Sequence, residues 1–121
     1  MAWYLLWGAI LVVAIGCGGT TPEIQLSDGE KDYVTFCAAC HEPGQGIGPV
    51  LTAEVLDDRV TAARLFAYNR DKMPYSAERT LADEQYWAIT AYLVTRSGFM
   101  PVDSIVLGPH TADGVVLRVD D

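Results

Sequence analysis

The chain has 121 residues, half of them hydrophobic, and a formal net charge of −8, which predicts one small domain. So acidic a chain lacks the basic surface that nucleic acid requires, and nucleic-acid binding is excluded; docking directly onto anionic lipid headgroups is disfavoured for the same reason. The acidic balance favours a protein partner with a basic face or, more commonly, solubility alone.

The N-terminal segment, residues 1–22, carries no charged side chain. Its apolar run from Trp3, continued through a glycine-rich stretch to Thr20, reaches the ~20 residues that a bilayer requires. Trp3, Tyr4 and Trp7 gather at one end, as is typical of the aromatic belt at a membrane interface. We therefore expect residues 1–22 to form a transmembrane anchor, with the rest of the chain on the extracytoplasmic, periplasmic side.

Two other interpretations of this segment compete. A cleaved secretory signal normally carries Lys or Arg before its apolar run, and this one has none. A lipoprotein signal ending at Cys17 would place the acylated residue after Ala14-Ile15-Gly16, a loose match to a lipobox. We favour the retained anchor over both.

The first helix is expected at about residues 28–38. Ser27-Asp28-Gly29-Glu30 has the pattern of a capping box, in which Ser27 accepts from the first-turn amides and Glu30 reaches back. Gly29 and Tyr33 share one face at helical spacing, and a glycine there permits close approach of another helix.

Cys37-Ala38-Ala39-Cys40-His41 follows directly. Two thiols three residues apart, with an imidazole after the second, are the arrangement that attaches a c-type haem. The cysteines can each form a thioether to a porphyrin vinyl group, and the histidine supplies an axial ligand to the iron. We expect one covalent haem c, bound by Cys37, Cys40 and His41.

The alternatives to haem are weaker. A structural zinc site requires a second pair of Cys or His residues at similar spacing, and the sequence offers only Cys17 and His110. A thioredoxin-like redox motif requires a βαβ pattern, which is not visible.

Residues 42–51 contain three glycines and two prolines, which excludes regular structure. The ordinary interpretation is a surface loop. We expect more of it: the Pro49 carbonyl should accept from His41 Nδ1–H, which fixes the ring and raises its basicity, and Leu51 should pack on the porphyrin.

Two further helices are expected, over residues 59–69 and 83–97, the second with a stripe of Tyr86, Ile89 and Leu93. Met73 lies between them and can supply a thioether as sixth ligand. Filling a core is the commoner role of methionine. Met100, beyond the last helix, and His110 are the alternatives to Met73.

The chain resembles the class I c-type cytochromes, the mitochondrial-type monohaem fold, over about residues 27–108. The resemblance rests on Gly29-x-x-x-Tyr33-x-x-x-Cys37-x-x-Cys40-His41, Gly46-x-Gly48-Pro49-x-Leu51, Met73-Pro74 and Asp83-Glu84-x-Tyr86-Trp87-x-Ile89-x-Ala91-Tyr92-Leu93. It implies an all-α cytochrome c fold of three to four helices around a covalent haem, here preceded by a transmembrane helix. The first and last helices should cross near Gly29 and Tyr92.

The implied organisation is an anchor over residues 1–22, a cytochrome c domain over 23–108 and a C-terminal tail over 109–121. Family members commonly have Ser where this chain has Ala82, as cap of the last helix, and the loss should cost ~1 kcal/mol unless Thr80 substitutes. The runs at 105–107 and 115–119 could form short strands or wrap a partner.

The function implied is a membrane-tethered electron carrier, not an enzyme, because His41 and Met73 would fill both axial positions. Water would be excluded by Tyr33, Trp87 and Tyr92 together with Pro49 and Leu51. We expect the partners to be a redox protein and membrane subunits of a respiratory or photosynthetic electron-transfer complex. The alternative is a gas or peroxide sensor, or an enzyme, in which the sixth ligand is displaced; a module without haem ranks last.

Overall fold

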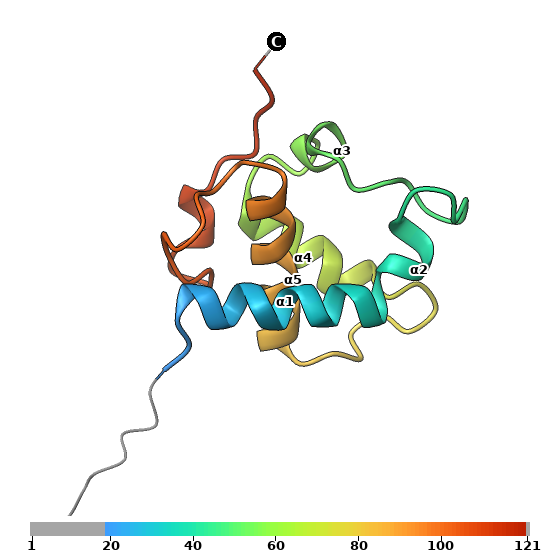
Figure 1. Ribbon diagram of the computed structural model, residues 1–121, viewed down its shortest axis with the longest axis horizontal. Coiled ribbons are helices and arrows are strands. Elements are labelled where there is room, and N and C mark those ends of the chain that lie inside the picture. Colours follow the sequence, from blue (N-terminus) through green and yellow to red (C-terminus); the bar gives the residue numbers. More distant parts are fainter. Residues whose placement is uncertain (1–18, 121) are drawn as a thin grey trace, which may run out of the picture.

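The computed structural model describes residues 19–120, and these residues fold as helices and loops (Figure 1). No strand occurs among them; one isolated antiparallel bridge joins Thr61 to Val116. The all-α expectation is confirmed for this part of the chain. The elements, in chain order, are α1 (Pro22–Phe36), α2 (Ala38–His41), α3 (Ala53–Asp57), α4 (Ala62–Lys72), α5 (Asp83–Arg96) and the short 3-10 helix η1 (Ala112–Gly114).

The predicted membrane anchor and Cys17 fall on residues 1–18, apart from the last few positions, and so lie outside the described residues. Across residues 19–120, no helix combines the length and the apolar character needed to cross a membrane.

Helix α1 begins six residues earlier than the capping-box pattern predicted, so that prediction was wrong. Thr21 has extended backbone, and its Oγ1 accepts from the Ile24 N–H at 3.3 Å. Pro22 occupies the first helical position, where its fixed φ suits the helix and its missing N–H costs nothing. Ser27 lies inside the helix, where the amides it would cap are already bonded along the backbone.

Helices α1 and α5 cross at Gly29, as the sequence predicted. A Cβ at Gly29 would overlap the carbonyl of Ala88 and lie 3.0 Å from the Tyr92 Cβ. The rings of Tyr33 and Tyr92 pack against each other one turn further on, tilted by 48° with centroids 5.3 Å apart. The crossing therefore places the middle of α1 against the middle of α5, and Cys37 follows at the C-terminal end of α1.

Helix α4 starts at Ala62 rather than at residue 59 as expected. Thr61 caps it by accepting from the Arg64 N–H at 3.3 Å, and Val60 has a φ of 72°, which is incompatible with a helix. Helix α5 begins at Asp83 as predicted. Its cap, Ala82, has no side-chain acceptor; Gln85 Oε1 accepts from the Ala82 N–H at 3.0 Å, and Thr80 does not substitute.

The chain after α5 packs against its own domain. The runs at 105–107 and 115–119, for which short strands or contact with a partner were the two possibilities, form no strand; Val116 makes only the single bridge to Thr61. Leu107, Ala112 and Leu117 are buried in the same core as the helices. Gln25, itself buried, exchanges two hydrogen bonds with the backbone of Leu107, each of 2.8 Å. This pairing fastens the segment to the start of α1, where Figure 1 shows the two lying side by side.

We predict that Gly29→Ala lowers the free energy of unfolding by about 1–3 kcal/mol, because the added methyl group overpacks the contact with Ala88. Helix propensity alone would give the opposite sign, by about 1 kcal/mol. Denaturant unfolding of the holoprotein measures the change. Gly108→Ala is the control, since a Cβ there meets nothing within 4 Å; equal stability of the two variants would contradict the crossing.

Candidate functional site

The predicted haem-binding residues meet at one cavity of about 390 Å³. Cys37 ends α1, and the N–H groups of Cys40 and His41 both donate to the Cys37 carbonyl at 3.1 Å. This tight turn brings the two thiols and the imidazole to the same wall. The lining comprises Phe36, Cys37, Cys40, His41, Ile47, Gly48, Pro49, Leu51, Asn69, Met73, Pro74, Tyr75, Leu81, Tyr86, Ile89 and Leu93.

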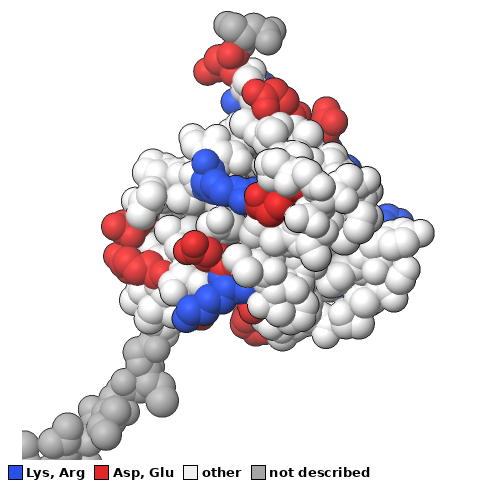
Figure 2. Space-filling view, turned by 45° about the vertical axis from the view of Figure 1, so that its right-hand side comes forward, with Lys and Arg blue, Asp and Glu red and all other residues white. Residues whose placement is uncertain are grey.

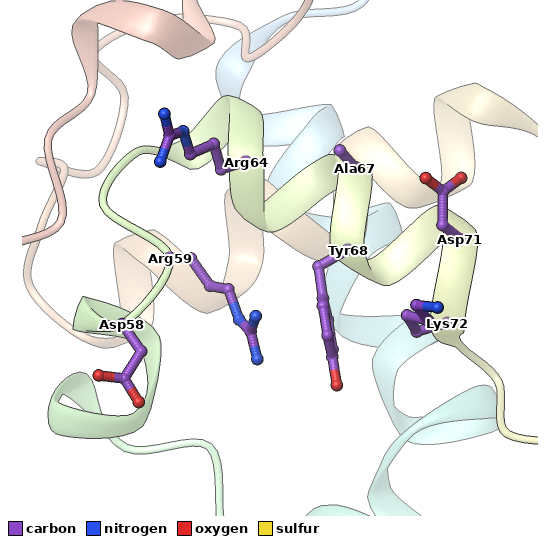
Figure 3. Close-up of a pocket in the computed structure, with 7 residues that line it drawn as sticks. All are labelled: Asp58, Arg59, Arg64, Ala67, Tyr68, Asp71 and Lys72. Atoms are coloured by element: carbon purple, nitrogen blue, oxygen red, sulfur yellow. The ribbon is translucent and has the colours of Figure 1, made fainter.

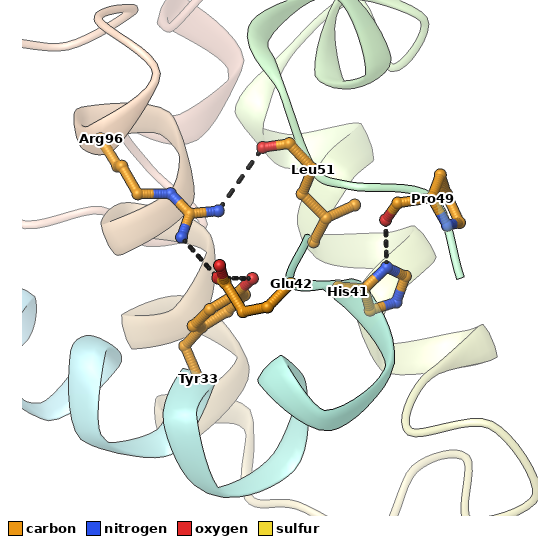
Figure 4. Close-up of polar contacts among 6 residues, drawn as sticks. All are labelled: Tyr33, His41, Glu42, Pro49, Leu51 and Arg96. Atoms are coloured by element: carbon orange, nitrogen blue, oxygen red, sulfur yellow. Dashed lines mark hydrogen bonds and ion pairs between the residues drawn. The ribbon is translucent and has the colours of Figure 1, made fainter. Parts of the chain in front are cut away.

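The His41 imidazole is held by the loop that follows it (Figure 4). Its Nδ1 lies 2.7 Å from the Pro49 carbonyl oxygen, as the sequence predicted. Because a carbonyl can only accept, Nδ1 donates to it, and Nε2 is the ring nitrogen that is left to ligate a metal. The side chain is only 8 % exposed, so the ring is fixed in one orientation with a free ligating nitrogen.

Gly48 allows the loop to lie directly against the ring. A Cβ at this position would come 2.8 Å from His41 Cε1 and 2.9 Å from Nδ1. The Gly48 N–H also donates to the Cys40 carbonyl at 2.9 Å. The sequence analysis predicted a contact between Pro49 and His41 but overlooked the close approach of Gly48 to the ring. The three glycines in so short a loop were the signal for such an approach.

Met73 reaches the cavity from the end of α4. The Tyr86 hydroxyl donates to the Met73 carbonyl at 2.8 Å and so fixes the chain at this point. Met100 lies instead in the hydrophobic core, 7 % exposed, and His110 is exposed on the C-terminal segment. Of the three candidates for a sixth ligand, the fold brings Met73 to the cavity.

The three aromatic residues expected to exclude water from the haem were misassigned. Tyr33, Trp87 and Tyr92 do not line the cavity; Trp87 stacks on Phe66 at 3.6 Å between centroids. The wall from α5 consists of the stripe Tyr86, Ile89 and Leu93. Only one face of a helix can point at a given neighbour, and the others cover the core or α1.

A polar cluster fastens the loop to the two crossing helices (Figure 4). The Tyr33 hydroxyl donates to Glu42 Oε1 at 2.6 Å, and Arg96 Nη1 donates to the same oxygen at 3.2 Å. Arg96 Nη2 reaches the Leu51 carbonyl at 3.5 Å, and the guanidinium lies 4.6 Å from the centre of the Tyr33 ring. The Glu42 end of the 42–51 loop is thereby tied to α1 and α5, and the Leu51 end to α5.

Electrostatics within this cluster follow from its geometry. The hydrogen bond from Tyr33, with Arg96 behind it, holds the pKa of Glu42 below its ordinary value. Burial and the neighbouring Glu42 carboxylate raise the pKa of Tyr33 to about 12. At Cys37, burial, with Asp32 and Cys40 nearby, raises the thiol pKa to about 11, so this free cysteine remains a thiol at neutral pH.

These residues fit a covalently bound haem c. Two unpaired cysteines, an imidazole with a free Nε2 and a thioether surround one apolar cavity, and that combination of donors is the one by which c-type haem is attached and ligated. Among the described residues no group of three or more His, Cys, Asp or Glu forms an alternative metal site. The fold and the site are those of a c-type cytochrome.

Comparison with known proteins agrees. The family described as "Cytochrome C oxidase, cbb3-type, subunit III" matches residues 25–93, more than half of the chain, and the protein belongs to this family. A cytochrome c domain of this kind implies a covalent haem c and a role in electron transfer. No curated protein matches the chain.

Among solved structures, a chain of the sulfane dehydrogenase SoxCD from Paracoccus pantotrophus is similar, with a TM-score of 0.58 and 23% sequence identity. The match covers 76% of this chain and 52% of that chain, so the present chain corresponds to about half of the SoxCD chain. At this identity the likeness shows the fold alone.

We predict that Tyr33 makes stability fall at alkaline pH. In the unfolded chain its phenol ionises near 10.0, whereas the folded chain keeps the proton to about 12. Between these values the unfolded state binds fewer protons than the folded state. The contribution of Tyr33 to the free energy of unfolding is therefore complete below pH 10 and falls by roughly 2 kcal/mol as the pH rises towards 12.

Unfolding of the wild type and of Tyr33→Phe at a series of pH values measures this contribution as a difference, which cancels the other tyrosines and the lysines. The difference should be constant at neutral pH and shrink above pH 10. A difference that does not change with pH would show that burial and Glu42 do not raise the pKa of Tyr33 in the folded protein.

Proposed function

We propose that the protein is a membrane-tethered carrier of single electrons, with His41 and Met73 as axial ligands and Cys37 and Cys40 as thioether attachments. The observation that carries the proposal is the meeting of these four side chains at one apolar cavity. They come from two separate parts of the chain, the α1–α2 junction and the end of α4. The bound haem would supply the one-electron couple of its iron.

The roles of the chain's own residues follow from their contacts. Pro49 fixes His41 through Nδ1 and raises its basicity as a ligand. Tyr86 fixes Met73 through the backbone. His41 and Met73 together would occupy both protein-facing coordination positions of a bound haem iron and would leave none for a substrate, which favours electron transfer over catalysis at this site.

The apolar walls set the environment of the site. Leu51, Leu81, Ile89 and Leu93 line the cavity and exclude water, which disfavours the more highly charged ferric state. His/Met ligation shifts the reduction potential in the same direction. Both effects suit a carrier of relatively high potential.

An exposed apolar rim around the cavity supports exchange of electrons with another protein. Phe36, Ile47 and Tyr75 line the cavity and yet are 38%, 76% and 81% exposed. Figure 2, with the α2 side of the molecule turned forward, shows a broad uncharged area over its right half. Large exposed apolar side chains grouped at one site mark a contact surface.

We further propose that residues 1–22 anchor the chain, with the haem domain on the periplasmic side. An anchor raises the effective concentration of the carrier near a membrane oxidoreductase. The family description names an oxidase subunit and the similar structure is of a dehydrogenase. Both names support a place as a subunit of an oxidoreductase complex. We propose that this complex belongs to a respiratory or photosynthetic electron-transfer chain.

We predict that Met73→Ala abolishes the weak sulfur-to-iron charge-transfer band of the ferric protein and lowers its reduction potential, because the thioether ligand is lost. The c-type α-band of the reduced protein should persist, since Cys37 and Cys40 are unchanged. Visible spectra and a potentiometric titration of protein matured in a haem-attaching host make the measurement.

Met100→Ala is the matched control. It removes a methionine buried in the core and should lower the free energy of unfolding by about 2–5 kcal/mol while leaving the charge-transfer band in place. Loss of the band in Met100→Ala but not in Met73→Ala would overturn the ligand assignment. A high-spin wild type that binds CO when reduced would favour a sensor or an enzyme instead.

A further inference from the structure

A second hollow, of about 340 Å³, lies beside α4 and the loop that precedes it (Figure 3). It is separate from the haem-binding cavity and is formed by side chains away from the buried face of α4, which comprises Ala62, Leu65 and Phe66. Its lining is Asp58, Arg59, Arg64, Ala67, Tyr68, Asp71 and Lys72.

The hollow collects positive charge in an acidic protein. Three of the eight Lys and Arg residues line it, namely Arg59, Arg64 and Lys72. Within residues 19–120, none of the three has a carboxylate partner within 4.0 Å; the salt bridges there involve Arg70, Arg79 and Arg96. These three cations are therefore available to an external anion.

The two acids of the hollow do not cancel this charge. Asp71 is already paired with Arg70 at 3.0 Å and with Arg79 at 2.9 Å, so its charge is offset from outside the hollow. Asp58 and Arg59 form no ion pair with each other. The local balance is positive.

Arg59 is held ready for a ligand. Its guanidinium lies 3.6 Å from the centre of the Tyr68 ring, and Figure 3 shows both side chains extending the same way. Stacking on an aromatic face leaves the in-plane N–H groups of a guanidinium free, in the fork geometry that binds a carboxylate through two hydrogen bonds.

We propose that this hollow binds an acidic segment of the protein with which the chain exchanges electrons, an inference that rests on the proposed carrier function. Carboxylates fit better than phosphates, because the Asp58 carboxylate borders the hollow and repels a doubly charged group more strongly than a singly charged one. A nucleic acid or an anionic membrane presents negative charge over a wide area and so also faces the acids elsewhere on a chain of net charge −8, whereas a short acidic segment meets only the hollow.

The position of the hollow relates it to the haem-binding cavity. Tyr68 and Lys72 line the hollow, whereas Asn69 and Met73 line the cavity. Each pair is four residues apart, so along and just beyond α4 the two rows run next to each other, about 100° apart around its axis. A partner whose acidic segment occupies the hollow thus lies against the Met73 side of the haem-binding cavity.

The test is an NMR titration of the reduced, full-length holoprotein with a hexaglutamate peptide. A salt concentration of about 0.1 M limits electrostatic reach to about 10 Å, so that the hollow's cations outweigh acids elsewhere on the molecule. We expect saturable shifts confined to Arg59, Tyr68 and Lys72. Arg59→Gln and Lys72→Gln should each weaken binding by about tenfold, as expected for loss of a charge-assisted contact.

Arg118→Gln is the matched control, since it removes the same charge from an exposed position outside the hollow. Equal weakening by Arg59→Gln and Arg118→Gln would overturn the proposal, as would shifts spread over all Lys and Arg residues. Tighter binding of inorganic phosphate than of the peptide would overturn it in favour of a phosphate site.

Failure of this proposal is distinguishable from failure of the carrier function. The α-band and reversible oxidation are recorded on each sample used in the titration. A protein that is fully redox-active but does not bind the peptide at Arg59 overturns the docking site alone. A protein without the α-band overturns the carrier function, wherever the peptide binds.

Discussion

The close crossing of α1 and α5 at Gly29 is the constraint on which the site depends. Because Gly29 has no side chain, α1 lies directly on the Ala88 carbonyl, and its C-terminal end is placed beside the stripe Tyr86, Ile89 and Leu93. Cys37 and the turn to His41 follow at that end. One backbone contact thus sets where the cysteine thiols and the imidazole meet the apolar wall of the cavity.

Hydrogen bonds and ion pairs, rather than regular secondary structure, hold the rest of the site against α1 and α5. Pro49 orients His41, while Glu42 and Arg96 tie the intervening loop to both helices. A glycine- and proline-rich loop has little order of its own, so these bonds must supply it. Met73 is positioned in the same manner, through a backbone carbonyl bonded to Tyr86.

Sequence reasoning succeeded where a function requires particular residues at short spacing. Local patterns predicted the cluster of Cys37, Cys40 and His41, which the fold brings to one cavity, and the Pro49 contact. The Gly29 crossing was implied by the resemblance to the class I c-type cytochromes. It failed at the start of α1, because Ser27 to Glu30 suits a cap but Thr21 and Pro22 already begin the helix. It also misassigned Trp87 and Tyr92, because which face of α5 meets the cavity depends on tertiary packing.

Charge gives the clearest case of what composition alone cannot predict. A net charge of −8 favours a partner with a basic face, but the fold pairs or disperses the acids and leaves Arg59, Arg64 and Lys72 together beside α4. In physiological salt, charges interact over only about 8 Å. A partner at the Met73 side of the cavity therefore meets this local positive group, and the arrangement of charges outweighs their sum.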